Sequence, residues 1–128
     1  MKVIIDTNFL LIPAQFKVDI FTEIDRICNF DYKLYIIDKT IDELHNIIEK
    51  QKGRDKDAAK LALSLINHKD LNIIHTNSSK DIVDDLIVKE AQKEQLIVAT
   101  NDKELKQKLA NKARMIVLKS RKYLAFGG

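Results

Sequence analysis

Near its start the chain reads Val3-Ile4-Ile5-Asp6-Thr7-Asn8, three β-branched apolar residues followed at once by three polar ones. A short, wholly apolar run is typical of a strand that is buried on both faces of a parallel sheet. Ligands of such sheets bind beyond the carboxyl ends of the strands. The polar residues after this run are therefore the first candidates for a functional site.

Four more apolar runs resemble the first, and segments of helical periodicity separate them. The expected strands are Val3–Ile5, Leu34–Ile37, Leu71–Ile74, Leu96–Thr100 and Met115–Leu118. The expected helices are Val18–Cys28, Thr40–Lys52, Asp55–Ile66, Lys80–Lys93 and Lys103–Lys112. This alternation predicts an α/β fold in which helices cover a five-stranded parallel sheet.

Composition favours one folded domain over residues 1–128, because the chain is 45% hydrophobic with only three glycines and one proline. Disordered and collagen-like classes are excluded. The single cysteine, Cys28, has no partner for an internal disulfide and falls on an apolar helical stripe, which favours a reduced, intracellular setting. No apolar run approaches the ~20 residues needed to span a bilayer, so we expect a cytoplasmic protein without a membrane segment.

The net charge of +3 conceals an uneven distribution of charge. Residues 103–128 hold eight basic residues and one acid, a charge of +7, whereas residues 1–102 carry a charge of −4. A basic segment of this kind is a candidate for contact with the phosphates of a nucleic acid.

Acidic residues follow the expected strands or begin the expected helices. They are Asp6, Glu43, Asp84 or Asp85, and Asp102. Each acid alone has a structural explanation, since Thr40-x-x-Glu43 and Ser78-x-x-Asp81 are capping-box sequences and Asp102 suits a helix N-cap. Capping does not explain why they converge on one edge of the sheet.

Carboxylates gathered at one edge repel one another, and a divalent cation removes that penalty. Oxygen ligands suit Mg²⁺ or Mn²⁺, whereas zinc calls for histidine or cysteine at ligand spacing, which His45, His68 and His75 do not show. One or two such ions held by carboxylates can orient a phosphodiester and activate water. The acids therefore indicate nuclease chemistry.

These motifs resemble those of the PIN-domain ribonucleases, most closely the branch with VapC-type toxins and rRNA-processing PIN nucleases. The motifs that carry the resemblance are Val3–Leu11, Asp42-Glu43-Leu44, Val83–Ile87, Ile97–Leu105 and Val117–Leu124. The resemblance implies a three-layer fold with strand order 3-2-1-4-5 and an acidic quartet of Asp6, Glu43, Asp84 and Asp102. It implies Mg²⁺ or Mn²⁺ bound by Asp6, Asp84 and Asp102, with Asp85 as a further ligand through water, and Asn8, Thr100 and Asn101 as polar supports. The activity implied is metal-dependent endonucleolytic hydrolysis of RNA that leaves a 5′-phosphate and a 3′-hydroxyl.

Basic residues are needed beside an acidic site to hold an RNA strand. The candidates are Lys39, Lys103, Lys119, Arg121 and Lys122, with the stretch 50–56 as either a basic hairpin over the substrate or an ordinary solvated turn. The aromatic residues mostly adjoin apolar runs, so we expect them in the core and not as stacking platforms.

Two other α/β classes are excluded by their motifs. A receiver domain needs an acidic pair after the first strand and an aspartate after the third, where this chain has His75-Thr76-Asn77. A haloacid-dehalogenase phosphatase needs Asp-x-Asp where Asp6-Thr7-Asn8 stands. The remaining alternative is a non-catalytic PIN-like RNA-binding module in a larger complex.

The resemblance also implies partners. A toxin would have an antitoxin that blocks the acidic site, whereas an rRNA-processing nuclease would meet ribosome-assembly factors. A homodimer is implied as well, with the apolar segment Phe9–Ile12 as one candidate interface, although burial inside the monomer is the preferred interpretation of that segment.

Overall fold

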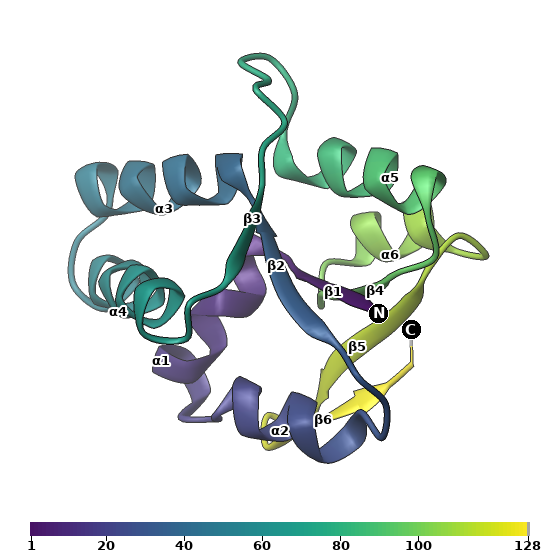
Figure 1. Cartoon of the computed structure of the whole chain (residues 1–128). Helices are drawn as coiled ribbons and strands as arrows, with labels where there is room; N and C mark the ends of the chain where they lie inside the picture. Colours follow the sequence, from purple (N-terminus) through teal and green to yellow (C-terminus); the bar gives the residue numbers. More distant parts are fainter. Residues whose placement is uncertain (128) are drawn as a thin grey trace.

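A six-stranded mixed sheet runs through the centre of the computed structural model, which describes residues 1–127 (Figure 1). Its strands are β1 (Lys2–Ile5), β2 (Lys33–Ile37), β3 (Asn72–Ile74), β4 (Ile97–Ala99), β5 (Arg114–Lys119) and β6 (Tyr123–Phe126). They lie in the order β3-β2-β1-β4-β5-β6, and every neighbouring pair is parallel except β5 and β6. The predicted order 3-2-1-4-5 is confirmed for the five parallel strands.

Helices cover both faces of the sheet and give three layers (Figure 1). They are the 3-10 helix η1 (Thr7–Leu11) and the α-helices α1 (Ile12–Phe16), α2 (Ile20–Ile27), α3 (Asp38–Lys50), α4 (Arg54–His68), α5 (Val83–Lys93) and α6 (Lys103–Leu109). Alternate residues of β1 divide the core, because Val3 and Ile5 pack with the η1, α1, α2 and α4 side and Ile4 packs with the α5 and α6 side. No helix within residues 1–127 has both the length and the apolar character to cross a membrane.

The sixth strand extends the predicted sheet at one edge. It pairs antiparallel with β5 through a turn at Ser120 and Arg121, both of which have positive φ. Positive φ at two consecutive turn residues is the geometry of a type I′ hairpin, whose usual sequence signal is Asn-Gly or Asp-Gly. The strand was not predicted because the chain forms this turn without glycine.

No helix or strand was predicted for the segment between Asp6 and Lys17. Here η1 and α1 continue the chain after β1, and Phe9, Leu10, Leu11 and Ile12 are all buried. Their apolar side chains therefore pack inside the monomer, as the preferred interpretation held. Pro13 lies in the first turn of α1, where its missing N–H removes no hydrogen bond.

Helix boundaries differ from the predictions mainly at capping positions. Helix α3 begins at Asp38, so Thr40 lies inside the helix and is fully buried, and the capping-box prediction at Thr40 is wrong. Helix α5 begins at Val83, and Ser78 bonds the backbone N–H of Asp81 ahead of the helix instead of capping it. At Asp102 the prediction is confirmed, because its carboxylate accepts the N–H of Leu105.

Aromatic side chains are mostly packed against the core, and the prediction is wrong for two of them. Phe9 and Phe21 are buried, and Phe30 packs against Phe126. Phe16 and Tyr123, in contrast, are exposed. Phe16 is the last residue of the short helix α1, which packs into the core through Ile12 at its other end.

Candidate active site

Asp6 lies at the carboxyl end of β1 and is almost fully buried, with 3% of its surface exposed. Its Oδ1 accepts the backbone N–H of Thr7 at 2.9 Å, and its Oδ2 accepts the hydroxyl of Thr100 at 2.9 Å. Thr100 directly follows the neighbouring strand β4, so the sheet itself brings the two residues together. The predicted support of Asp6 by Thr100 is therefore a hydrogen bond in the structure.

The carboxyl of Asp6 ionises with difficulty. Burial is the main cause that raises its pKa to about 6, and the negative charges of Asp84 and Asp102 raise it further. The hydrogen bonds from Thr100 and Thr7 act in the opposite direction. Three acids that are far apart in the sequence thus share one electrostatic environment.

Asp84 and Asp85 occupy the first turn of α5 but lie in different surroundings. Burial, followed by the charges of Asp102 and Glu43, raises the pKa of the half-buried Asp84 carboxyl. Asp85 is exposed, and its Oδ1 accepts a hydrogen bond from Lys108 Nζ at 3.2 Å. The structure therefore groups Asp84 with the other acids and pairs Asp85 with a lysine of α6.

Asp102 is tied to the same network through Thr100. The N–H of Asp102 donates to the Thr100 hydroxyl oxygen at 3.1 Å, while that hydroxyl donates to Asp6. One carboxylate oxygen of Asp102 caps α6 at Leu105, at 3.0 Å. Because capping uses only Oδ1, the other oxygen remains available for a ligand.

Glu43 reaches the acidic edge from α3, and its charge raises the pKa of Asp84. The position of α3 is fixed by a buried hydrogen bond between the hydroxyls of Thr7 and Thr40, 3.0 Å apart. Thr40 lies three residues before Glu43 on neighbouring turns of α3, so this contact holds the part of the helix that carries Glu43. Sequence reasoning assigned Thr40 to a cap and missed this contact.

A second missed residue, Asp38, holds the loop that leads into α5. Its carboxylate accepts the N–H groups of Thr76 and Asn77 and the Thr76 hydroxyl, at 2.7 to 3.2 Å. These bonds together lower its pKa, although burial opposes them. Asp38 follows β2 directly, which is the signal that could have drawn attention to it. Asp38 is therefore a structural anchor for the chain before Asp84.

The acids fit a hydrated divalent cation better than a tightly enclosed metal. Within residues 1–127 no three histidine, cysteine or acidic side chains are arranged to hold a metal ion by themselves. Mg²⁺ commonly binds through one or two carboxylates and keeps several of its waters. Two carboxyls whose pKa values are raised by burial and then by neighbouring acids belong to a donor set that such a cation would neutralise.

Asn8 and Asn101, which were predicted to support the acids, differ in what they contact. Asn101 uses its Oδ1 to accept the N–H of Leu118 at 2.9 Å, so it holds β5 beside the end of β4. Asn8 is exposed and lines a cleft next to Asp102. The structure records no hydrogen bond from either amide to an acidic side chain of the described residues.

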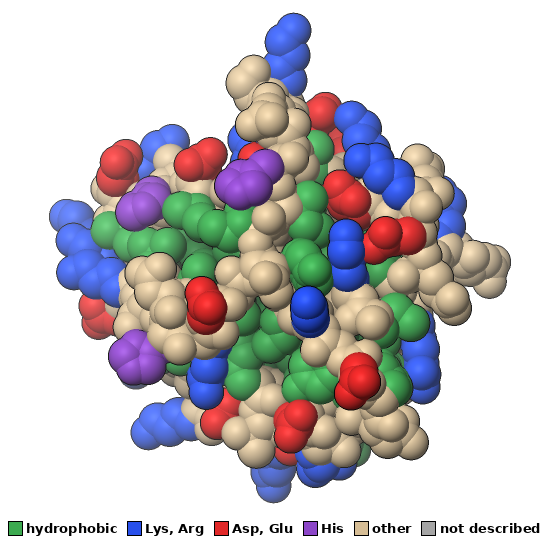
Figure 2. Space-filling model, in the orientation of Figure 1, with side chains coloured by type: hydrophobic (Ala, Val, Ile, Leu, Met, Phe, Trp, Pro, Cys, Tyr) green, Lys and Arg blue, Asp and Glu red, His purple; other side chains and the backbone are tan. Residues whose placement is uncertain are grey.

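The predicted RNA-binding residues surround this edge. Lys39 and Lys103 are the second residue of α3 and the first of α6. Lys119, Arg121 and Lys122 are exposed around the β5–β6 turn, and none of these five forms an ion pair with another described residue. Figure 2 shows Lys and Arg side chains beside acidic ones over the α5 region. The stretch 50–56 begins at the last residue of α3, whereas Glu43 lies near the middle of that helix.

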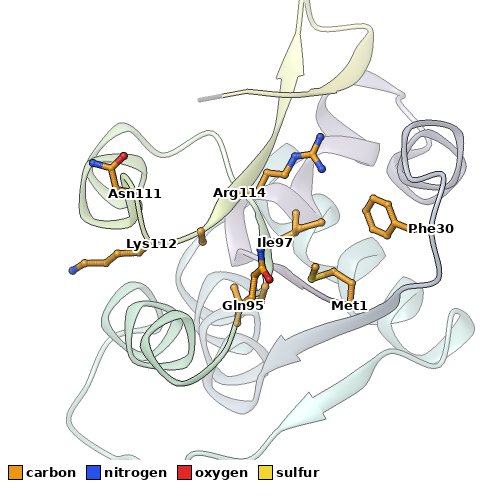
Figure 3. Close-up of a pocket in the computed structure, with 9 residues that line it drawn as sticks. Met1, Phe30, Gln95, Ile97, Asn111, Lys112 and Arg114 are labelled. Carbon is orange, nitrogen blue, oxygen red and sulfur yellow. The ribbon is translucent and has the colours of Figure 1, made fainter.

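A cavity larger than the cleft beside Asp102 lies at the opposite edge of the sheet, where β4 and β5 begin (Figure 3). It has a volume of about 430 Å³, and its lining includes Gln95, Lys112 and Arg114 but no acidic side chain. The group of Asp6, Asp84 and Asp102 lies instead at the carboxyl edge, where ligands of open parallel sheets bind.

A three-layer fold, in which the parallel strands of the central sheet bring acids to their carboxyl edge, is the architecture of PIN-like proteins. The family model described as "PIN like domain" matches residues 3–121, so the chain belongs to this family. It is 34% identical to ribonuclease VapC4 of Methanocaldococcus jannaschii over 99% of this chain and 97% of that protein. It is also 30% identical to ribonuclease VapC9 of Archaeoglobus fulgidus, over 82% of this chain and 73% of that protein.

The fold agrees with a solved PIN-domain structure. The structure of the PIN domain endonuclease Utp24 matches with a TM-score of 0.81 at 23% sequence identity. The match covers 98% of this chain and 90% of that one. The predicted three-layer PIN-like fold is thereby confirmed.

Proposed function

We propose that this chain is a divalent-metal-dependent endoribonuclease. The observation that carries the proposal is the electrostatic coupling of Asp6, Asp84, Asp102 and Glu43 at the carboxyl edge of the sheet. The names of the two ribonuclease relatives support RNA as the substrate. All four acids are present, which favours catalysis over a module that only binds RNA.

Asp6, Asp84 and Asp102 would hold Mg²⁺ or Mn²⁺, with Asp85 limited to a more distant contribution because it pairs with Lys108. When bound, the cation supplies positive charge for the transition state and lowers the pKa of a water. Thr7 and Thr100 fix both oxygens of Asp6, and Thr100 also orients the backbone of Asp102. These bonds would keep two of the acids in place when the substrate arrives.

Glu43 has a separate role in the proposal. Its carboxylate makes no hydrogen bond or ion pair with another described residue, and it is half-exposed. A carboxylate in this position can bind the attacking water and accept its proton. Lys39 and Lys103, at the same edge, would hold the phosphates on either side of the scissile bond.

The test is RNA cleavage by the full chain with Mn²⁺, with Mg²⁺ and with a chelator. We expect cleavage only with a metal, with 5′-phosphate and 3′-hydroxyl ends on the products. Asp6→Asn and Asp84→Asn should each lower the rate by more than about 100-fold, since even residues that orient metal ligands are worth about 10–100-fold. Asp85→Asn is the matched control, because it removes a neighbouring charge on the same helical turn and should change the rate only a few-fold.

Two results would contradict the proposal. One is RNA binding without any metal-dependent product, which would establish the non-catalytic RNA-binding module instead. The other is equal loss of activity in Asp84→Asn and Asp85→Asn, which would show that the acidic surface as a whole matters and not the grouping of Asp84 with Asp6.

The partners also belong to the proposal. The chain aligns with VapC4 over nearly the whole length of both proteins, which favours the toxin role and therefore an antitoxin that blocks the acidic edge. A role in ribosome assembly is supported only by the similarity of the fold to Utp24. A gene for a small antitoxin next to this one would support the first. Homodimerisation stays a prediction that sedimentation of the purified chain would test.

A further inference from the structure

A small cleft opens beside the acidic edge, between α1 and the connection from β4 to α6. It has a volume of about 230 Å³ and is lined by Asn8, Phe9, Ile12, Gln15, Phe16, Asn101 and Asp102. Asp102 belongs both to this cleft and to the acidic group. A molecule in the cleft would therefore extend directly from one bound at the acids.

One wall of the cleft carries an exposed aromatic ring. Phe16 is 39% exposed, an unusual state for a phenylalanine in a chain whose other phenylalanines are buried or packed against the core. The guanidinium of Arg121 lies over the ring, 5.9 Å from its centroid. A ring with a cation at one side and solvent beside it can stack on a flat ligand.

The backbone on both sides of this pair adopts an unfavourable conformation. Lys17 ends α1 with φ 56°, and Ser120 and Arg121 form the hairpin turn with φ 52° and 56°. A left-handed residue commonly ends a helix, and two in succession form a type I′ turn. Here they end α1 at Phe16 and turn Arg121 back over its ring.

We infer that this cleft binds a nucleobase of the RNA strand whose scissile phosphate lies at the acids. The inference rests on the proposed function for the identity of the strand. Phe16 stacks on the base, as aromatic side chains do when proteins bind single-stranded RNA. The amides of Asn8 and Gln15 can donate to and accept from a base edge. Arg121, which has no acidic partner among residues 1–127, binds the adjoining phosphate.

The composition of the cleft favours a base over a segment of protein. Three amides and a carboxylate interrupt its apolar lining, and its volume is small. A specific protein–protein interface usually involves about 20 to 30 residues on each side, whereas seven residues line this cleft. Lys119 and Lys122, which are exposed near Arg121, also suit a polyanion.

The experiment measures RNA binding in an Asp6→Asn background, so that cleavage does not interfere. A single-stranded RNA oligomer and its single-abasic derivatives are titrated against Asp6→Asn, Asp6→Asn/Phe16→Leu and Asp6→Asn/Tyr123→Leu. We expect one abasic position to weaken binding by about 10-fold in Asp6→Asn, the size typical of stacking on one base. That sensitivity should disappear in the Phe16→Leu variant and persist in the Tyr123→Leu control, which removes an exposed aromatic outside the cleft.

The outcomes separate this inference from the proposed function. Cleavage by the wild-type chain together with an unchanged abasic profile in Phe16→Leu would overturn the base site and leave the nuclease intact. Loss of the abasic sensitivity in Phe16→Leu, with no cleavage by the wild-type chain, would support the base site in a non-catalytic module. An unaltered affinity for RNA in Phe16→Leu would also overturn the inference.

Discussion

At the level of single residues, Asp6 combines burial with a charge that its surroundings disfavour. Its pKa is raised from 3.8 to about 6 by burial and by neighbouring acids. A group whose pKa is higher in the folded state contributes stability at pH values below its unfolded pKa. It loses that contribution as the pH rises through its folded pKa. Ionised Asp6 should therefore destabilise the metal-free protein above about pH 6.

Replacing Asp6 with asparagine should remove this cost. The pKa shift corresponds to about 2 to 3 kcal/mol when fully developed, and we expect Asp6→Asn to raise the free energy of unfolding by about 2 kcal/mol at pH 7. The advantage should shrink between pH 6 and pH 4, where wild-type Asp6 becomes protonated. Urea unfolding in the presence of a chelator, at several pH values, measures the difference in free energy of unfolding between the variant and the wild type. Asp42→Asn, at an exposed position on α3, is the control. A difference between Asp6→Asn and the wild type that does not vary with pH would contradict the assignment.

Some features of the candidate site could be predicted from the sequence, and others could not. The positions of Asp6, Asp84 and Asp102 relative to the strands were predictable because strand ends in a parallel sheet must meet at one edge. The Thr7–Thr40 hydroxyl pair and the loop anchor at Asp38 were not, because each joins side chains more than thirty residues apart. Local patterns describe only neighbouring residues, so Thr40 suggested a cap when its partner is Thr7, which follows the neighbouring strand β1.

At the level of elements, β6 is an edge strand, and α2 satisfies the outward peptide groups of one of its residues, Leu124. Glu23 Oε1 accepts the N–H of Leu124 at 2.9 Å, and Arg26 donates to the carbonyl of Leu124 at 2.9 Å. Arg26 also forms a two-point ion pair with Glu23. An exposed strand edge can pair with other chains, and these contacts cover part of it.

Removing the Glu23 carboxylate should loosen this edge. We expect Glu23→Ala to lower the free energy of unfolding by about 1 to 2 kcal/mol, because it leaves the Leu124 N–H and Arg26 without their partner. The amide hydrogen of Leu124 should exchange faster with solvent, and both effects should be small in Glu23→Gln, whose amide oxygen still accepts. Glu49→Ala on the exposed face of α3 serves as the reference. Equal exchange of Leu124 in the two alanine variants would contradict the coupling of α2 to β6.

At the level of the whole molecule, opposite charges meet at the carboxyl edge. The acids come from strands and helices of the first 102 residues, and the β5–β6 turn brings three basic residues of the charged segment 103–128 to the same edge. Part of that segment is neutralised in the fold, since Lys108 pairs with Asp85 and Glu104. The segment therefore offers fewer unpaired cations than its sequence charge suggests, and three of them lie at the turn.

The salt dependence of RNA binding tests this arrangement. Each phosphate neutralised on a single strand contributes about 0.7 to the slope of log Kd against log salt concentration. Replacing Lys119, Arg121 and Lys122 together with glutamine should therefore lower the slope by about 2 in the Asp6→Asn background without divalent metal. The matched control replaces Lys50, Lys52 and Arg54, which changes the net charge equally at the turn between α3 and α4. If both triple variants lower the slope alike, the attraction is spread over the surface. If the control lowers it more, the strand crosses the far end of α3 and the edge beside the acids is not its path.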